Sequence, residues 1–196
     1  MRGQRRRRRP RRGQADTPLT QWRIRRGTVS DAAALAAFGA RTFDETFGPD
    51  NDPADIAAYL AEEYGVPQQT AELADPGQIT LLAEHLGTIA GFAQLRTKRP
   101  PPCVTGDAPV EIARFYVDRP HHGTGLAHQL MTAVRAVAVE MGGRTLWLGV
   151  WERNPRAIAY YAKSGLRDVG SADFFVGPDR QTDRIMAGPL DPFTRG

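Results

Sequence analysis

Residues 116–127 constrain the possible fold of this chain more than any other segment. A mostly apolar run ends at Val117, a turn with two glycines follows it, and an amphipathic pattern starts directly afterwards at Leu126. Gly123 and Gly125 carry no side chain, so they leave the backbone N–H groups of the turn uncovered where a helix begins. These N–H groups have no partner within the helix and lie at the positive end of its dipole, so they bind anions. The segment therefore predicts a strand, a phosphate-binding turn and a helix in succession.

Two common phosphate-binding loops do not fit this turn. The chain has no Gly-Lys-Ser/Thr sequence here, and the dinucleotide fingerprint needs three glycines on a different spacing and an acidic residue further on. The pattern that remains is His122-x-x-Gly125-x-Ala127. It resembles the pyrophosphate-binding loop of the Gcn5-related N-acetyltransferase (GNAT) family, in which the first loop residue is usually Gln or Arg rather than His.

Two further segments resemble the same family in the expected order. Residues 110–117 precede the loop and resemble the family's fourth strand, and residues 146–154 predict another strand that ends in Asn154. A helix is expected directly afterwards, because Pro155 suits a first helical turn and Gly165 the position just past the end. This segment resembles the family's run of Asn, Ala and an aromatic-Tyr pair, followed by Gly-Phe, except that residue 166 is Leu.

The resemblance covers about residues 22–190. It implies an α/β (α+β) fold with a central, mostly antiparallel, twisted mixed sheet, helices on both of its faces, and fourth and fifth strands that splay apart. Residue periodicity supplies the other elements. It predicts a strand at residues 22–26, a helix capped by Ser30, amphipathic helices near residues 53–65 and 68–74, a hairpin over residues 79–95, and strands around residues 174–176 and 184–186.

The 196 residues, 41% of them hydrophobic, are enough for one domain with a sizeable core. We expect an arginine-rich, disordered tail over residues 1–18 and an N-acetyltransferase domain over residues 19–196. Residues 1–26 hold eleven arginines and one acidic residue, which leaves a net charge of −6 for the rest of the chain. The tail predicts at most a weak contact with RNA, without stacking on bases, since no aromatic residue lies within it.

Other classes of protein are excluded by what the sequence lacks. No run of 18 apolar residues and no signal-peptide pattern is present, so we expect no membrane partner and a cytoplasmic location. Cys103 is the single cysteine, which excludes an internal disulfide and a cysteine metal site, and no metal is expected. The sequence is compatible with a monomer or a homodimer.

The resemblance implies that acetyl-CoA is the cosubstrate. Its pyrophosphate would bind the N–H groups of the loop, and its pantetheine arm would bind the exposed backbone of the fourth strand and the side chain of Asn154. The coenzyme-binding residues expected on this basis are Phe115, Tyr116, Val117, His122, Gly123, Thr124, Gly125, Leu126, Ala127 and Asn154.

Two residues are predicted to take part in catalysis. Tyr161 occupies the family position whose hydroxyl approaches the coenzyme sulfur, and it would protonate the leaving thiolate as the general acid. Glu111 is the candidate base, since strand alternation places it on one face with Ala113 and Phe115. The alternative for Glu111 is an ion pair with Arg114.

The predicted function is acetyl transfer to a primary amine by direct attack on the thioester. A small, cationic, polyamine-like acceptor is expected, because the chain resembles the bacterial spermidine/spermine-type branch at residues 147–152 and 174–183. Residues 43–64 would wall the acceptor site. The alternatives are acetylation of a protein N-terminus or lysine, and a noncatalytic module that binds acetyl-CoA.

Overall fold

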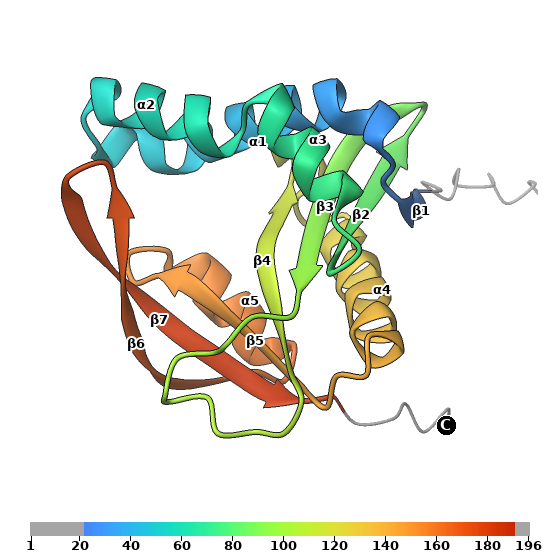
Figure 1. Ribbon diagram of the computed structural model, residues 1–196, viewed down its shortest axis with the longest axis vertical. Coiled ribbons are helices and arrows are strands. Elements are labelled where there is room, and N and C mark those ends of the chain that lie inside the picture. The colour runs from blue at the N-terminus through green and yellow to red at the C-terminus, as the bar shows by residue number, and fades with distance from the viewer. Residues whose placement is uncertain (1–21, 191–196) are drawn as a thin grey trace, which may run out of the picture.

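The computed structural model describes residues 22–190, which form one seven-stranded mixed sheet with helices on both faces (Figure 1). The predicted tail at residues 1–18 lies outside the described residues. Strand order is β1-β2-β3-β4-β5-β7-β6, and all neighbours are antiparallel except β4 and β5. The strands are β1 (Arg23–Arg26), β2 (Gln78–His85), β3 (Thr88–Arg96), β4 (Pro109–Val117), β5 (Thr145–Trp151), β6 (Arg167–Val176) and β7 (Asp179–Pro189). The predicted fold class is confirmed.

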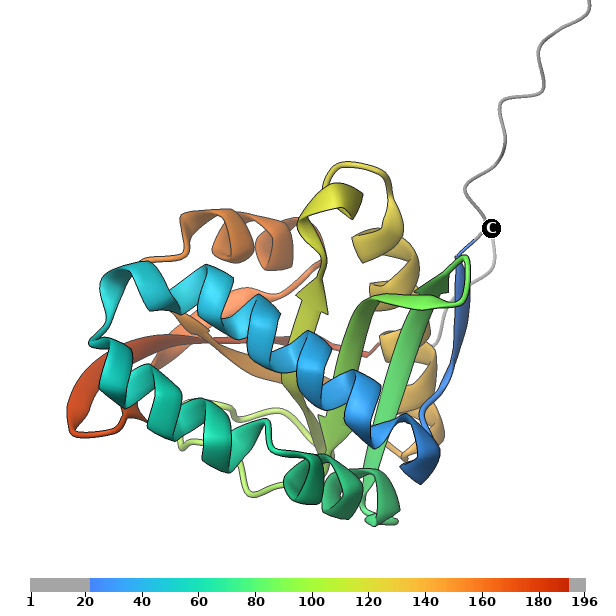
Figure 2. The same cartoon turned by 90° about the horizontal axis from the view of Figure 1, so that it is seen from above.

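Five α-helices cover the sheet in two groups, which Figure 2 shows from above. One face carries α1 (Ala32–Phe47), α2 (Pro53–Glu63) and α3 (Val66–Ala74), and the other carries α4 (Leu126–Glu140) and α5 (Pro155–Lys163). Each group buries its own apolar cluster, α4 against β2, β3 and β4, and α1 against Leu82 and Phe92. Within residues 22–190, no helix combines the length and the apolar character that crossing a membrane requires.

The helix cap predicted at Ser30 is wrong by one residue, since the N-cap of α1 is Asp31. Ser30 lies inside a short 3-10 turn (Val29–Asp31), and α1 begins at Ala32. Asp31 stabilises this turn, because its Oδ2 accepts hydrogen bonds from the backbone N–H and the hydroxyl of Thr28 at 2.8 and 3.0 Å. The last two strands were predicted at the correct places, but each is much longer than the short apolar run that indicated it.

Strand β4 contains a bulge that decides which side chains reach each face of the sheet. Gln94 of β3 pairs with Arg114 and the next residue, Leu95, pairs with Ile112, so Ala113 is an extra residue on β4. The alternation of side chains is therefore inverted across Ala113. Phe115 lies on the α4 side with Ile112, whereas Glu111 lies on the opposite face with Arg114. The expected common face of Glu111 and Phe115 is wrong for this reason.

Strands β4 and β5 pair only at their beginnings and then part. Pairing extends over Pro109–Glu111 of β4 and Thr145–Trp147 of β5, although both strands continue for several residues (Figure 1). Beyond Glu111 the backbone groups of β4 that face β5 have no strand partner there. Strand separation of this kind leaves N–H and C=O groups available to a ligand.

Candidate active site

A cleft of about 1130 Å³ lies where β4 and β5 part. Ile112–Val117 of β4 and Leu148–Trp151 of β5 form its inner walls. Residues of the glycine turn, α4 and α5 line one end, and aromatic residues of α1, α2 and β6 line the other. The two ends differ in chemistry.

The glycine turn forms an open cradle at the first end. Gly123 and Gly125 have φ angles of +76° and +96°, which favour glycine, and a Cβ added at either would meet no atom within 4 Å. Gly125 is the N-cap of α4, so the first N–H groups of the helix have no partner within it and lie at its positive end. This geometry fits a phosphate group bound by main-chain donors.

Eight of the ten predicted coenzyme-binding residues line the cleft. Thr124 and Leu126 do not: the Thr124 hydroxyl donates to the carbonyl of His121 at 2.6 Å, and the Leu126 side chain is fully buried under the sheet. The main-chain N–H of Thr124 also points to the carbonyl of His121, at 3.4 Å, whereas that of Leu126 belongs to the first turn of α4 and has no partner within the helix. The eight residues that line the cleft are Phe115, Tyr116, Val117, His122, Gly123, Gly125, Ala127 and Asn154.

His122 ties the turn to the end of β4. Its ring Nε2 lies 2.8 Å from the carbonyl oxygen of Val117. Because a carbonyl can only accept, Nε2 carries the proton and Nδ1 is the remaining free ring atom. The histidine that replaces the usual Gln or Arg therefore supports the loop through its side chain, and its main-chain N–H donates to the carbonyl of Arg119 at 3.0 Å.

Cationic side chains gather at the same end of the cleft. Arg156 and Lys163 of α5 line it, accompanied by His121 and His128. Two further cations of the cleft lie nearer to α1, since Arg119 is paired with Glu45 and Arg153 lines the same recess as Asp50. Clustered positive charge around a concave site attracts anions and concentrates them there. The main-chain cradle and this charge together favour a ligand with several phosphate groups.

Tyr161 lies on α5 with its ring edge-on to Phe115 of β4, at a centroid distance of 6.2 Å. It lines the cleft, and its hydroxyl makes no hydrogen bond to any residue from 22 to 190. Burial raises the pKa of Tyr161 well above its usual range, so the hydroxyl keeps its proton at neutral pH. The neighbouring Tyr160 differs, because its hydroxyl donates to the carbonyl of Ala127 at 2.8 Å and so fastens α5 to α4.

Asn154 is the N-cap of α5. Its Oδ1 accepts a hydrogen bond from the N–H of Ala157 at 3.1 Å, which fixes the side chain at the rim of the cleft. The side-chain amide Nδ2 has no partner among the described residues and remains a possible donor to a bound ligand.

The structure does not bring Glu111 to the cleft. Its carboxylate accepts a hydrogen bond from Nε of Arg96 at 2.6 Å, across the β3–β4 pair, and Glu111 is buried where β4 and β5 are still joined. The predicted alternative of an ion pair is correct in kind, but the partner is Arg96 rather than Arg114. This placement gives no support to Glu111 as the base.

Aromatic rings from α1, α2, β5 and β6 surround the second end of the cleft. The Phe43 ring lies 4.5 Å from that of Phe47 and 4.7 Å from that of Tyr59, while Phe47 also contacts Trp151 at 5.4 Å. The remaining members of this aromatic group are Tyr64 and Phe174. Residues 43–64 therefore wall this end, as expected, although Asp44 and Glu62 lie outside it and Glu45 is paired with Arg41 and Arg119.

Arg114 supports this aromatic wall from beneath. Its guanidinium lies 4.7 Å from the centre of the Tyr64 ring, and it donates to Glu72 at 2.5 Å and to Glu63 Oε2 at 2.8 Å. A further hydrogen bond of 2.7 Å reaches Gln94 of β3. Arg114 thus joins β3 and β4 to the junction of α2 and α3. This role of Arg114 does not follow from strand alternation, because it depends on the bulge at Ala113.

Asp183 of β7 is the other residue that the sequence analysis missed. It lines the cleft near the aromatic group, on the sheet face away from α4 and α5. A signal was present, since Asp183 alternates with Ile185 and Ala187, which are both buried. An acidic residue in register with inward-facing apolar residues indicates a functional carboxylate or a buried ion pair.

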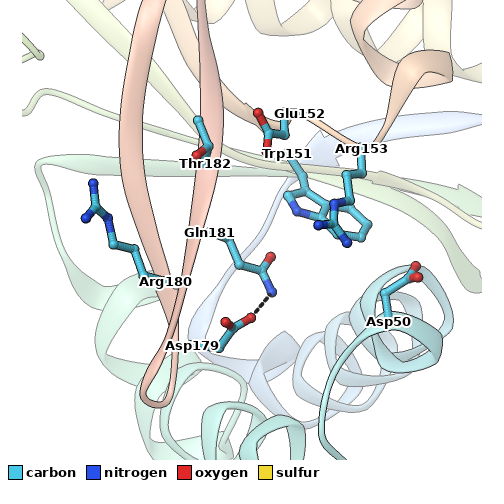
Figure 3. Close-up of a pocket in the computed structure, with 8 residues that line it drawn as sticks. All are labelled: Asp50, Trp151, Glu152, Arg153, Asp179, Arg180, Gln181 and Thr182. Atoms are coloured by element: carbon cyan, nitrogen blue, oxygen red, sulfur yellow. Dashed lines mark hydrogen bonds between the residues drawn. The ribbon is translucent and has the colours of Figure 1, made fainter.

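A smaller polar recess of about 120 Å³ adjoins the cleft and shares Asp50, Trp151 and Arg153 with it (Figure 3). The β6–β7 hairpin forms its other side, where Gln181 Nε2 donates to Asp179 Oδ2 at 2.8 Å. Within residues 22–190, no group of three or more His, Cys, Asp or Glu side chains is arranged to hold a metal ion.

Comparison with known proteins agrees with this geometry. A model of the acetyltransferase (GNAT) family matches residues 41–166. An uncharacterized N-acetyltransferase of Mycobacterium tuberculosis is 35% identical over 163 residues, which are 83% of this chain and 99% of that protein. One from Lactobacillus delbrueckii subsp. lactis is 31% identical over 88% of this chain and 99% of its own length.

Solved structures of acetyltransferases share the fold. The PaiA N-acetyltransferase of Thermoplasma acidophilum, solved in complex with coenzyme A, superposes with a TM-score of 0.71. The two proteins are 17% identical, and the match covers 86% of this chain and 99% of the other. A putative acetyltransferase of Salmonella typhimurium, solved with acetyl-CoA, gives a TM-score of 0.61 at 23% identity over 90% of this chain and 98% of its own.

Proposed function

The chain belongs to the acetyltransferase (GNAT) family and is an N-acetyltransferase, and we propose that it transfers the acetyl group of acetyl-CoA to a small, cationic, polyamine-like primary amine. The observation that carries this proposal is the division of one cleft into a cationic end and an aromatic end. The first suits the phosphates of the coenzyme. The second suits an ammonium group, because aromatic faces and carboxylates both attract cations.

In the proposed reaction, the amine attacks the thioester directly. The pyrophosphate of the coenzyme binds the N–H groups of the turn, and the pantetheine arm lies along the unpaired part of β4, at Phe115–Val117. A main-chain N–H of β4 stabilises the negative charge that develops on the thioester oxygen. Tyr161 donates its proton to the departing thiolate.

The proposed acceptor can be tested by measuring thiol release from acetyl-CoA. The panel consists of polyamines, aminoglycosides, amino acids and peptides, each at several concentrations. We expect turnover with polyamines and other small primary amines, because the cleft is lined by Asp50 and Asp183 as well as by aromatic rings. Acetylation of peptides alone would contradict the small-amine assignment and favour a protein acetyltransferase. Coenzyme binding without turnover of any acceptor would indicate a noncatalytic module.

The Gly125→Glu substitution should weaken acetyl-CoA binding by roughly tenfold or more, that is, by at least about 1.4 kcal/mol. The new carboxylate would enter the open cradle and repel the pyrophosphate, and the φ angle of +96° is unfavourable for any side chain. Gly142→Glu is the matched control, since Gly142 has a φ of +82°, has equally open surroundings and lies past the other end of α4. Calorimetry on both folded variants checks the prediction, and equal affinities would contradict the placement of the pyrophosphate.

Deletion of residues 1–18 should leave acetylation of a small amine and the melting temperature unchanged. The first described residue is Trp22, and β1 begins at Arg23, so the described sheet and the residues that line the cleft all follow the deleted segment. We propose that the tail provides a weak contact with RNA, which should be lost on deletion and should weaken with salt. Reduced activity or stability of the truncated protein would show that the tail belongs to the domain.

A further inference from the structure

Asp183 extends into the cleft from β7, diagonally across from Gly149 of β5, which has no side chain. It pairs with Trp151 of β5 and with Ala172 of β6, and it lines the cleft. A Cβ added at Gly149 would lie 2.7 Å from Oδ2 of Asp183, so the carboxylate occupies the space directly over Gly149. Gly149 also lines the cleft between the splayed strands. The bare backbone at Gly149 therefore allows this carboxylate to face the reaction space.

The Asp183 carboxylate has no hydrogen-bond or ion-pair partner among residues 22–190. Other carboxylates that are shielded from water each accept a hydrogen bond from an arginine: Asp31, Glu72, Glu84, Glu111 and Asp118. Burial alone raises the pKa of Asp183 to about 6. The carboxylate is thus a stronger proton acceptor than an exposed aspartate, and it is still ionised at neutral pH.

The surroundings of Asp183 suit an ammonium group. Tyr59 of α2 is the titratable group that faces it, while β5 and β6 present Trp151, Gly149 and Ala172. Burial raises the pKa of Tyr59, so its hydroxyl stays neutral. An ammonium at this position would contact aromatic rings and one free carboxylate, and both stabilise a cation. Arg114 of β4 also acts on Tyr59, but its guanidinium is paired with Glu63 and Glu72.

We propose that Asp183 is the base that takes the proton from the acceptor's ammonium group, a role that rests on the amine acetylation proposed above. Proton transfer to the carboxylate leaves a neutral amine, whose lone pair forms the N–C bond as the C–S bond breaks. The nitrogen then loses a second proton to solvent, while Tyr161 gives its proton to the thiolate and regains one from solvent. One proton is released overall, and it leaves Asp183 for solvent when the product departs.

The test is the pH dependence of kcat/KM, measured from about pH 5 to about pH 9 with the best amine of the panel. In the wild type, kcat/KM should fall below pH about 6, where Asp183 becomes protonated, and should be nearly level above it. In Asp183→Asn only the free amine can react, so kcat/KM should rise tenfold per pH unit toward the amine's pKa of about 10. At neutral pH the variant should be slower by roughly tenfold or more.

Two controls separate this role from a general effect of charge or folding. Asp173→Asn removes one charge from the same β6–β7 hairpin, where Asp173 is exposed and paired with Arg180, and it should leave the profile unchanged. Calorimetry should show unchanged acetyl-CoA affinity in Asp183→Asn, which also reports that the fold is intact. Superimposable profiles for the wild type and Asp183→Asn would overturn the proposal, as would an altered profile in Glu111→Gln instead.

Gly149→Ala provides a second test that leaves Asp183 in place. The new methyl group would displace the carboxylate, so kcat/KM should fall when Asp183 is present. The pH below which kcat/KM decreases, about 6 in the wild type, should also change. In an Asp183→Ala background the same substitution should have little further effect, since the two residues act as one unit. Additive losses would contradict the coupling. If the wild type acetylates no amine of the panel, the proposed function fails and the role of Asp183 fails with it.

Discussion

Replacement of Tyr161 by Phe is expected to lower the turnover number on the order of 10²-fold with little change in acetyl-CoA affinity, the scale typical of losing a positioned proton donor. The Tyr161 ring packs edge-on to Phe115, and this contact is kept in the variant. Only the hydroxyl is removed, and it has no hydrogen-bond partner among the described residues that the substitution could disturb. The loss should therefore appear in the chemical step rather than in folding or binding.

Tyr160→Phe is the matched comparison, on the next residue of the same helix. Its hydroxyl donates to the carbonyl of Ala127, so this variant should lose stability of about 1 kcal/mol and keep its turnover number. Rapid-mixing kinetics, with chemistry shown to be rate-limiting, would measure both variants. A change of less than about threefold in Tyr161→Phe would show that the thiolate leaves unassisted or takes its proton from water.

Local signals in the sequence were sufficient for the elements around the coenzyme end of the cleft. Glycines that need a positive φ, a proline in a first helical turn and an Asn cap each act within a few residues, so α4, α5 and the turn between β4 and α4 were predicted with nearly correct bounds. The coenzyme-binding roles of residues there remain predictions. The sequence carried enough information because these features are short-range.

The acceptor end could not be predicted in the same way, because it depends on contacts between distant segments. Simple alternation placed Glu111 with Phe115, but one extra residue at Ala113 inverts the faces of β4. Asp183 reaches the cleft only because β7 lies next to β5 in the sheet, with β6 on its other side. Neither the bulge nor this strand order follows from local residue patterns. The sequence therefore did not distinguish Asp183, whose carboxylate is free in the described part of the chain, from Glu111, whose carboxylate is paired.

Replacement of Arg114 by Met should lower the free energy of unfolding by about 3–5 kcal/mol, the cost of leaving a buried charge without its partner. Glu72 is only 7% exposed and accepts from Arg114 at 2.5 Å, so in the variant its carboxylate would lose its buried cation. Met preserves most of the length of the side chain. Urea unfolding of both proteins measures the difference.

The exposed pair of Arg184 with Asp168 is the control for this prediction. It has two hydrogen bonds of 2.8 Å, but both side chains are more than a third exposed, so Arg184→Met should change the free energy of unfolding far less than Arg114→Met. Adding Glu72→Gln to Arg114→Met should recover part of the stability, because the unpaired charge is then gone. A loss below about 1 kcal/mol in Arg114→Met would show that water reaches Glu72.

Arg114 also lies against Tyr64 in the aromatic wall, so a weaker apparent affinity for the amine should accompany the loss of stability.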